Sequence, residues 1–311
     1  MSSFHIPVMQ REIIESLRCG PGGIYVDGTV GGGGHACEIL RHSAPDGLLI
    51  GLDVDDDALR ESEERLRPFG SRKILAKGNF ADIDTILASL NVREVDGILL
   101  DLGVSAHQLK TANRGFSFSL NSALDMRMDQ SRGLSAYDVI NTFPEEELKM
   151  IIKDYGEEMM AQRIVKRISV RRKTSPIETT AELADVVVKA LPSTFKIRKI
   201  HPATRTFQAI RIYVNNELLN LHNAVNRGVD VLRTSGRFSI ISFHSLEDRI
   251  VKDGFRSWEK GCICPPSLPV CACHRKAKLK ILTRKPITPA ASEIECNPQA
   301  RSAKLRTAER I

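Results

Sequence analysis

Two acidic residues on either side of a glycine run are the part of the sequence best suited to chemistry. Asp27 precedes the four glycines at 31–34, and Asp53 lies about 20 residues beyond them. A backbone without Cβ atoms can adopt positive φ and approach a ligand closely, and the turn leads into a helix N-terminus that favours an anionic group. At this spacing, an acid at the end of a second strand binds ribose hydroxyls.

Asp27 distinguishes between two classes of nucleotide cofactor. A carboxylate beside the glycines would repel the pyrophosphate of a dinucleotide, because like charges disfavour each other in one site. The same carboxylate would attract an ammonium group. Asp27 and Asp53 together therefore favour a nucleoside with a cationic amino-acid tail, a description that fits S-adenosylmethionine better than NAD. A nicotinamide-dependent oxidoreductase, which would share the fold and Asp53, is the alternative enzyme class.

The elements that must position these residues are short apolar strands that alternate with helices. Four predicted strands alternate with helix-like segments, and they lie at 23–26, 48–52, 72–77 and 95–100. This order predicts an α/β, Rossmann-like fold with a parallel sheet and right-handed crossovers, whose ligands lie at the carboxyl ends of the strands. The residues found at such ends are Asp27, Asp53, Phe80 and Asp101.

The alternation of strands and helices stops in the middle of the chain. Residues 108–199 have helical periodicity and no clear strand. The sequence therefore predicts a Rossmann-like domain formed by 1–107 and 200–311, with an all-helical domain of 108–199 inserted into it. The elements expected after the insert are a long helix over 203–226, a fifth strand over 236–243 and a terminal strand pair at 278–282 and 303–308.

Positive charge is concentrated in the predicted insert. The chain of 311 residues has a net charge of +7, and eleven Lys or Arg face only three acids within 163–205. Arg171, Arg172 and Lys173 form the densest run, which favours an RNA backbone as the partner, with a solvated helix face as the alternative. His244, directly after the fifth predicted strand, has two equal interpretations, an RNA contact or the cap of the next helix.

The cysteines bear on the compartment and on metal binding. Seven is an odd number, which indicates reduced thiols and a cytoplasmic protein, and neither a signal peptide nor an apolar run of about 18 residues is present. Four of the cysteines are grouped as Cys262, Cys264, Cys271 and Cys273. Zinc is one interpretation, but structural zinc sites usually space two cysteines by two residues, so the sequence favours a loop of reduced thiols without a metal. The sequence gives no indication of the oligomeric state.

Several motifs, in their order along the chain, carry a resemblance that covers nearly its whole length. They are Asp-Gly-Thr-Val-Gly-Gly-Gly-Gly-His at 27–35, Asp-Met-Arg-Met-Asp at 125–129, His-Pro-Ala-Thr-Arg at 201–205 and Phe-His-Ser-Leu-Glu-Asp at 243–248. In these stretches the chain resembles the bacterial RsmH (MraW) family. Members of that family use S-adenosylmethionine to methylate N4 of a cytidine in 16S rRNA of the small ribosomal subunit.

The resemblance implies a class I, Rossmann-like methyltransferase with a helical insert, in agreement with the pattern above. The cofactor contacts that it implies are Gly33, Gly34, His35, Asp53, Phe80, Asp101 and Gln108. Asp101 is also the candidate acceptor for the hydrogens of the cytosine amine, because such an acceptor would localise the lone pair that attacks the methyl group. An RNA-binding or assembly factor without activity is the alternative class, since it would explain the basic insert, although it would not explain a complete cofactor pocket.

Overall fold

The structure, a computed structural model, divides into two compact units. The first unit is formed by Met1–Gly103 with Leu218–Ile311, and the second by Val104–Glu217. The residues that the structure describes are 7–131, 133–192, 201–262, 264–265, 270 and 272–311. No helix in these stretches is long and apolar enough to cross a membrane.

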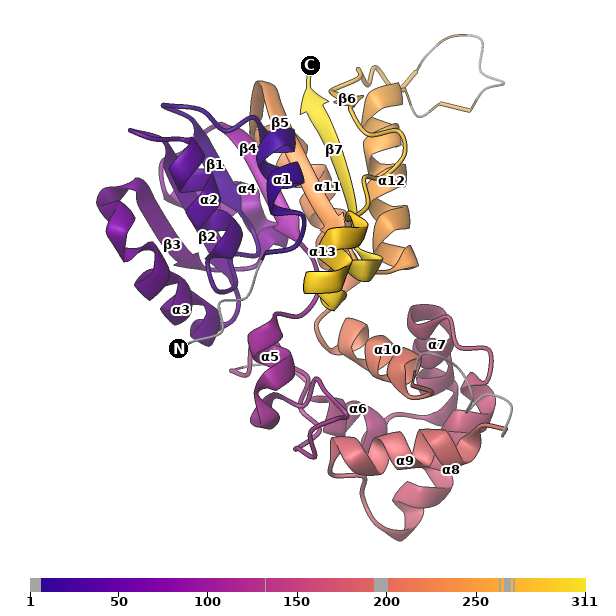
Figure 1. Ribbon diagram of the computed structural model, residues 1–311. Helices are drawn as coiled ribbons and strands as arrows, with labels where there is room; N and C mark the ends of the chain where they lie inside the picture. The colour runs from indigo at the N-terminus through magenta and orange to yellow at the C-terminus, as the bar shows by residue number, and fades with distance from the viewer. Residues whose placement is uncertain (1–6, 132, 193–200, 263, 266–269, 271) are drawn as a thin grey trace. The chain divides into compact units, whose positions relative to one another are not determined.

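A seven-stranded sheet forms the centre of the first unit (Figure 1). The strand order is β3-β2-β1-β4-β5-β7-β6, and all neighbours from β3 to β5 are parallel, whereas β7 is antiparallel to both β5 and β6. The strands are β1 (Ile24–Asp27), β2 (Leu48–Asp53), β3 (Lys73–Lys77), β4 (Val95–Asp101), β5 (Leu232–Ser242), β6 (Leu279–Ile281) and β7 (Lys304–Arg310). The predicted Rossmann-like fold and terminal strand pair are confirmed.

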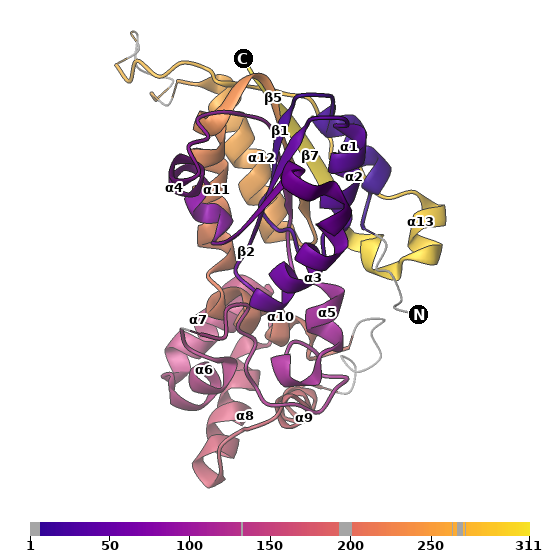
Figure 2. The same cartoon turned by 90° about the vertical axis from the view of Figure 1, so that its left-hand side faces the viewer.

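Helices cover both faces of this sheet, because successive side chains of a strand point to opposite faces. Tyr25 and Leu49 pack with α1, α2 and α3, whereas their neighbours Val26 and Ile50 pack with α4, α11 and α12. Figure 2 shows the two helix layers on either side of the strands. Burial on both faces explains why the strands read as continuous apolar runs. The helices of this unit are α1 (Gln10–Leu17), α2 (Gly34–His42), α3 (Asp56–Leu66), α4 (Ile83–Ser89), α11 (Glu217–Val231), α12 (Ser245–Lys260) and α13 (Ala291–Cys296), with short 3₁₀ turns η1 (Arg67–Arg72), η2 (Phe80–Asp82) and η5 (Pro298–Ser302).

The second unit is helical, with no strand among its described residues. Its elements are α5 (Ala106–Lys110), η3 (Ala112–Arg114), α6 (Ala136–Thr142), α7 (Glu145–Gly156), α8 (Ala161–Thr174), α9 (Thr180–Ala190) and α10 (Thr204–Val214). Capping boxes at Ser105, Ser135 and Thr179 satisfy the first N–H groups of α5, α6 and α9 and so define where these helices begin. Ile151 of α7 and Val165 of α8 belong to one common core.

The expectation of one long helix over 203–226 is wrong. The helix is interrupted at Asn216, whose φ of 51° lies in the left-handed region that asparagine tolerates. The preceding Asn215 fixes the break, since its side chain donates to the Met126 carbonyl at 2.8 Å and accepts from the Met128 N–H at 2.7 Å.

The break also places α10 in the helical unit. Phe207 and Ile210 of α10 are buried in the same core as Ile151, so the second unit continues to Glu217 and does not end at residue 199. The sequence placed α10 in the other domain because its apolar periodicity does not reveal which core it joins.

Candidate active site at the strand ends

A glycine turn joins β1 to α2 and is held by the neighbouring strands. The Gly28 N–H donates to the Leu99 carbonyl of β4 at 2.9 Å, and the Val30 N–H donates to a carbonyl of β2 at 2.9 Å. Gly31 and Gly33 have φ values of 51° and 75°, and a side chain would strain the backbone there. The turn therefore lies across the carboxyl ends of β2 and β4, as the sequence predicts.

Phe80 and Pro7 pack directly against this turn. A Cβ atom at Gly28 would lie 3.0 Å from the Cβ of Phe80, and one at Gly34 would lie 2.6 Å from the Cγ of Pro7. These glycines thus admit neighbouring protein groups to the turn. Phe80 is half-buried and follows Asn79, whose side chain accepts from the Ala81 N–H at 2.9 Å and fixes the start of η2.

Asp27 ends β1 as a buried carboxylate with 1% exposure. Its Oδ1 accepts from the Thr29 N–H at 3.1 Å and lies 3.5 Å from the Thr29 hydroxyl. Burial raises the pKa of Asp27 from 3.8 to about 7, although His35 and the Thr29 N–H oppose the rise. The carboxylates of Asp101 and Asp53 raise it further, so the three acids share one electrostatic neighbourhood.

Asp53 ends β2 and ties the turn to this strand. Its Oδ2 accepts from the Gly31 N–H at 3.0 Å and its Oδ1 from the Asp55 N–H at 3.0 Å. The surrounding protein raises the pKa of Asp53 from 3.8 to about 6, because the loss of water outweighs these two hydrogen bonds. Each carboxylate oxygen can accept a second hydrogen bond, so the side chain retains capacity for ribose hydroxyls.

Asp101 ends β4 beside His35 of α2. The His35 Nε2 lies 3.5 Å from the Asp101 Oδ2. Burial acts to lower the pKa of His35, but the carboxylates of Asp101 and Asp27 outweigh it, and the net effect is a raised pKa. His35 Nδ1 and Asp101 Oδ1 are buried and make no hydrogen bond to any described residue. Buried polar atoms of native proteins normally have a partner, so these two atoms mark a place where a polar ligand fits.

The site residues thus fit a cationic nucleoside. A cluster of three acids, of which Asp27 is almost fully buried, favours positive charge, because cations offset the cost of ionising buried carboxylates. A pyrophosphate would add negative charge to the same cluster. The fit supports S-adenosylmethionine and argues against NAD.

Gln108 is the predicted cofactor contact that lies in the second unit. Its side chain accepts from the Ser105 N–H at 3.0 Å and closes the capping box of α5. Sequence analysis did not single out Thr29, whose hydroxyl accepts from the Asp101 N–H at 2.7 Å and so joins β1 to β4. A threonine within the turn that follows an expected strand was the available signal.

His244 forms the cap of α12, which is one of its two expected roles. Its Nδ1 accepts from the Glu247 N–H at 3.5 Å, and its Nε2 lies 3.1 Å from the Glu247 Oε1. The Glu247 carboxylate accepts in return from the Phe243 N–H at 2.8 Å. Ring and carboxylate therefore order the end of β5 and the start of α12.

Two of the three basic residues proposed for RNA hold the helical unit together. Arg172 donates to the carbonyls of Ile140 at 2.8 Å and Phe143 at 2.7 Å, and Arg171 pairs with Glu182 at 3.4 Å. Lys173, in contrast, is exposed. The sequence could not separate these roles, because burial depends on where α6 and α9 pack.

A different set of cations lies on the outer face of α8. They are exposed, occur at helical spacing and form no ion pair with any described residue; we call them the α8 basic face, and they are Arg163, Lys166, Arg167 and Lys173. Residues separated by three or four positions lie on one side of a helix. The helix therefore presents one strongly positive surface.

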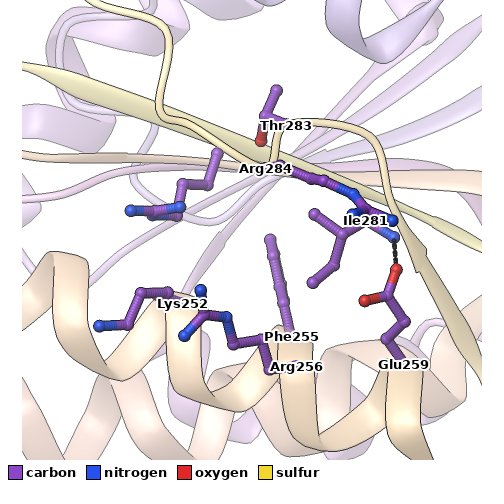
Figure 3. Close-up of a pocket in the computed structure, with 8 residues that line it drawn as sticks. Lys252, Phe255, Arg256, Glu259, Ile281, Thr283 and Arg284 are labelled. Atoms are coloured by element: carbon purple, nitrogen blue, oxygen red, sulfur yellow. Dashed lines mark hydrogen bonds between the residues drawn. The ribbon is translucent and has the colours of Figure 1, made fainter.

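A cavity of about 180 Å³ lies at the β6–β7 edge of the first unit, against α12 (Figure 3). Phe255 and Ile281 form apolar walls, and the Glu259 carboxylate accepts a hydrogen bond from the Ile281 N–H at 3.0 Å. The four cations that line the cavity are Lys252, Arg256, Arg284 and Arg306. This lining is unsuited to a cationic cofactor.

Comparison with known proteins shows the family to which the chain belongs. The model of the MraW methylase family matches residues 2–311. The chain is 62% identical over 309 residues to Ribosomal RNA small subunit methyltransferase H of Syntrophus aciditrophicus (strain SB), covering 99% of this chain and 98% of that protein. It is 54% identical over 307 residues to the protein of the same name from Syntrophotalea carbinolica (strain DSM 2380 / NBRC 103641 / GraBd1), again covering 99% and 98%. The chain therefore belongs to the MraW methylase family.

Proposed function

We propose that this protein transfers the methyl group of S-adenosylmethionine to N4 of a cytidine in 16S rRNA. The observation that carries the proposal is the family match over residues 2–311, together with relatives that are named as small-subunit rRNA methyltransferases. The buried acids at the ends of β1, β2 and β4 support it, because they suit a cationic nucleoside. The reducing cytoplasm is the compartment in which such an RNA and seven cysteines fit.

The chain binds the cofactor through the turn and the acids around it. S-adenosylmethionine, when bound, supplies an electrophilic methyl group on a sulfonium centre. Asp27 attracts the cationic tail, and Asp53 accepts hydrogen bonds from ribose hydroxyls. Gly33, whose positive φ bends the turn, and Gly34 offer the ligand their backbone atoms, and Phe80 packs beside it. His35 offers the cofactor its Nδ1, which has no partner among the described residues.

Asp101 acts on the cytosine amine. The lone pair of this amine is delocalised into the ring, so an oxygen that accepts its hydrogens makes it a better nucleophile. The Asp101 Oδ1 is buried and without a hydrogen bond to the described residues, while its Oδ2 lies beside His35. His35 therefore holds the carboxylate in position, and Oδ1 accepts from the amine. A stacked cytosine must swing out of its strand to reach this atom.

The RNA backbone lies on the helical unit in this proposal. The α8 basic face provides four cations that can neutralise phosphates without breaking intramolecular ion pairs. Arg171 and Arg172 act indirectly, because they hold α8 against α6 and α9. His244 acts in the same way by ordering the start of α12.

Methyl transfer from labelled S-adenosylmethionine to small ribosomal subunits that lack the modification tests the function. We expect label in the 16S rRNA, and nucleoside analysis by mass spectrometry should identify it as N4-methylcytidine. The exposed Asp253 of α12 offers a matched control, so Asp253→Asn should leave transfer unchanged. No transfer, or a label on another base or another ring position, would overturn the proposal.

A further inference from the structure

Three cysteine side chains converge in the segment between α12 and β6. The Sγ atoms of Cys262, Cys264 and Cys273 all lie within 4.8 Å of one another, and those of Cys262 and Cys273 are 3.8 Å apart. We call these three residues the thiol cluster. They come from two stretches of sequence with three prolines between them, and each is half-buried.

The spacing of the sulfurs is that of a metal site and not of a disulfide. A Zn–S distance of about 2.3 Å with tetrahedral angles puts two thiolates about 3.8 Å apart. A disulfide needs about 2.05 Å, and two neutral thiols gain little from approaching each other. A third sulfur at the same place has no role in a disulfide, whereas it adds a ligand to a metal.

Packing of apolar groups does not account for the convergence. Cys19 and Cys37 pack against the core beneath α1 and α2, as buried free cysteines usually do. No member of the thiol cluster belongs to a hydrophobic core formed by the described residues.

The backbone around the cluster is arranged to bring its two halves together. Gly261 ends α12 with a φ of 70°, and a Cβ there would collide with the backbone of Ala277, so the two ends of the segment cross closely. The Lys278 N–H donates to the Trp258 carbonyl at 2.9 Å, and the Arg275 guanidinium lies 3.8 Å from the centre of the Trp258 ring.

Polar groups near the cluster suit sulfur atoms that are bound to a metal. The Ala272 N–H points at the Cys264 Sγ at 3.4 Å, and such N–H donors stabilise metal-bound sulfur. Arg275 and Lys276 lie two and three residues after Cys273, and positive charge offsets that of metal-bound sulfur.

We propose that Cys262, Cys264 and Cys273 bind a structural Zn²⁺ ion. Each thiol gives up its proton to the solvent as its sulfur binds the metal, with no oxidation or reduction. The metal closes the segment between α12 and β6 in place of a hydrophobic core. The site is independent of the proposed function, because the cluster lies in the segment that leads into β6, and β6 is the edge strand separated from β1 and β2 by β4, β5 and β7. Cys271, expected to join any such group, lies outside the described residues.

Metal content of the full-length protein tests the site. The protein purified under reducing conditions should contain about one zinc ion per chain, measured by inductively coupled plasma mass spectrometry. The double variant Cys262→Ser/Cys273→Ser should lose this zinc, whereas Cys296→Ser, at an exposed cysteine outside the cluster, should retain it. Cobalt in place of zinc should give thiolate-to-cobalt charge-transfer absorption that is lost in the double variant.

A second readout separates loss of the metal from loss of the fold. The double variant should keep its calorimetric affinity for S-adenosylmethionine, since Asp27 and Asp53 lie on other strands, while residues 262–273 become more susceptible to proteolysis. Zinc-free purified protein, equal zinc in the double variant, or a Cys262–Cys273 disulfide under reducing conditions would overturn the inference.

Discussion

Asp27→Asn should stabilise the apoprotein while it weakens cofactor binding. The folded pKa of Asp27, about 7, lies above the ordinary value of 3.8, so the folded state binds the proton more tightly than the unfolded chain. Stability is therefore lost as pH rises from about 4 to about 7. At about 1.4 kcal/mol for each pKa unit, the loss is on the order of 4 kcal/mol. Asparagine carries no charge, and its Oδ1 can still accept from the Thr29 N–H.

Denaturant unfolding of both proteins across this pH range measures the effect. The variant should gain little near pH 4 and up to the order of 4 kcal/mol above pH 7, because the folded pKa of about 7 already includes the attraction of His35. If the free energy of unfolding of the variant exceeded that of the parent by the same amount at every pH, the assignment of a buried, protonated Asp27 would be refuted. A variant less stable than the parent at every pH would refute it as well.

Cofactor binding should release a proton from the same group. Near pH 7 about half of the apoprotein has Asp27 protonated, and a bound cation favours the charged form, so roughly half a proton should leave per cofactor. Calorimetry in buffers with different ionisation enthalpies measures this number. The release should fall near pH 9 and be much smaller in Asp27→Asn, where only groups such as Asp53 still titrate. Equal release in both proteins would place the cationic tail elsewhere.

Two further variants test the roles assigned to Asp101 and to α8. Asp101→Ala should lower kcat by about 10²–10³-fold through loss of the acceptor at Oδ1, which single-turnover methylation measures, and a kcat within a few-fold of the parent would exclude the acceptor role. Charge reversal at Arg163, Lys166 and Arg167 should weaken RNA binding and reduce the slope of log affinity against log salt by about 0.7–0.9 for each phosphate that the protein no longer neutralises. Filter binding measures the slope, Lys153→Glu on α7 is the matched control, and an unchanged slope would remove the RNA from this face.

The acids at the strand ends could be predicted because the signals are local. An apolar run followed by Asp27, Asp53 or Asp101 marks a strand end wherever the strand lies, and parallel strands bring their carboxyl ends to one edge. The alternation of strands and helices likewise predicts the parallel part of the sheet. What it leaves open is the place of β7, which lies antiparallel between β5 and β6 and depends on contacts across the whole chain.

Only the tertiary structure separated cations that are available to RNA from cations that hold the fold. Arg172 and Lys173 are adjacent in the sequence, yet one donates to two carbonyls near α6 and the other faces solvent. The direction of a side chain on a helix can be read from its spacing, but the identity of the neighbouring element cannot.

The sequence by itself determined which residues lie at the strand ends, because periodicity and turn chemistry are properties of a few consecutive residues. Only the folded structure shows which of their buried polar atoms have no hydrogen-bond partner among the described residues. Asp101 Oδ1 and His35 Nδ1 have no partner among the described residues, and three thiols meet beside β6. Such outcomes depend on contacts between residues far apart in the chain, and no short stretch of sequence contains them.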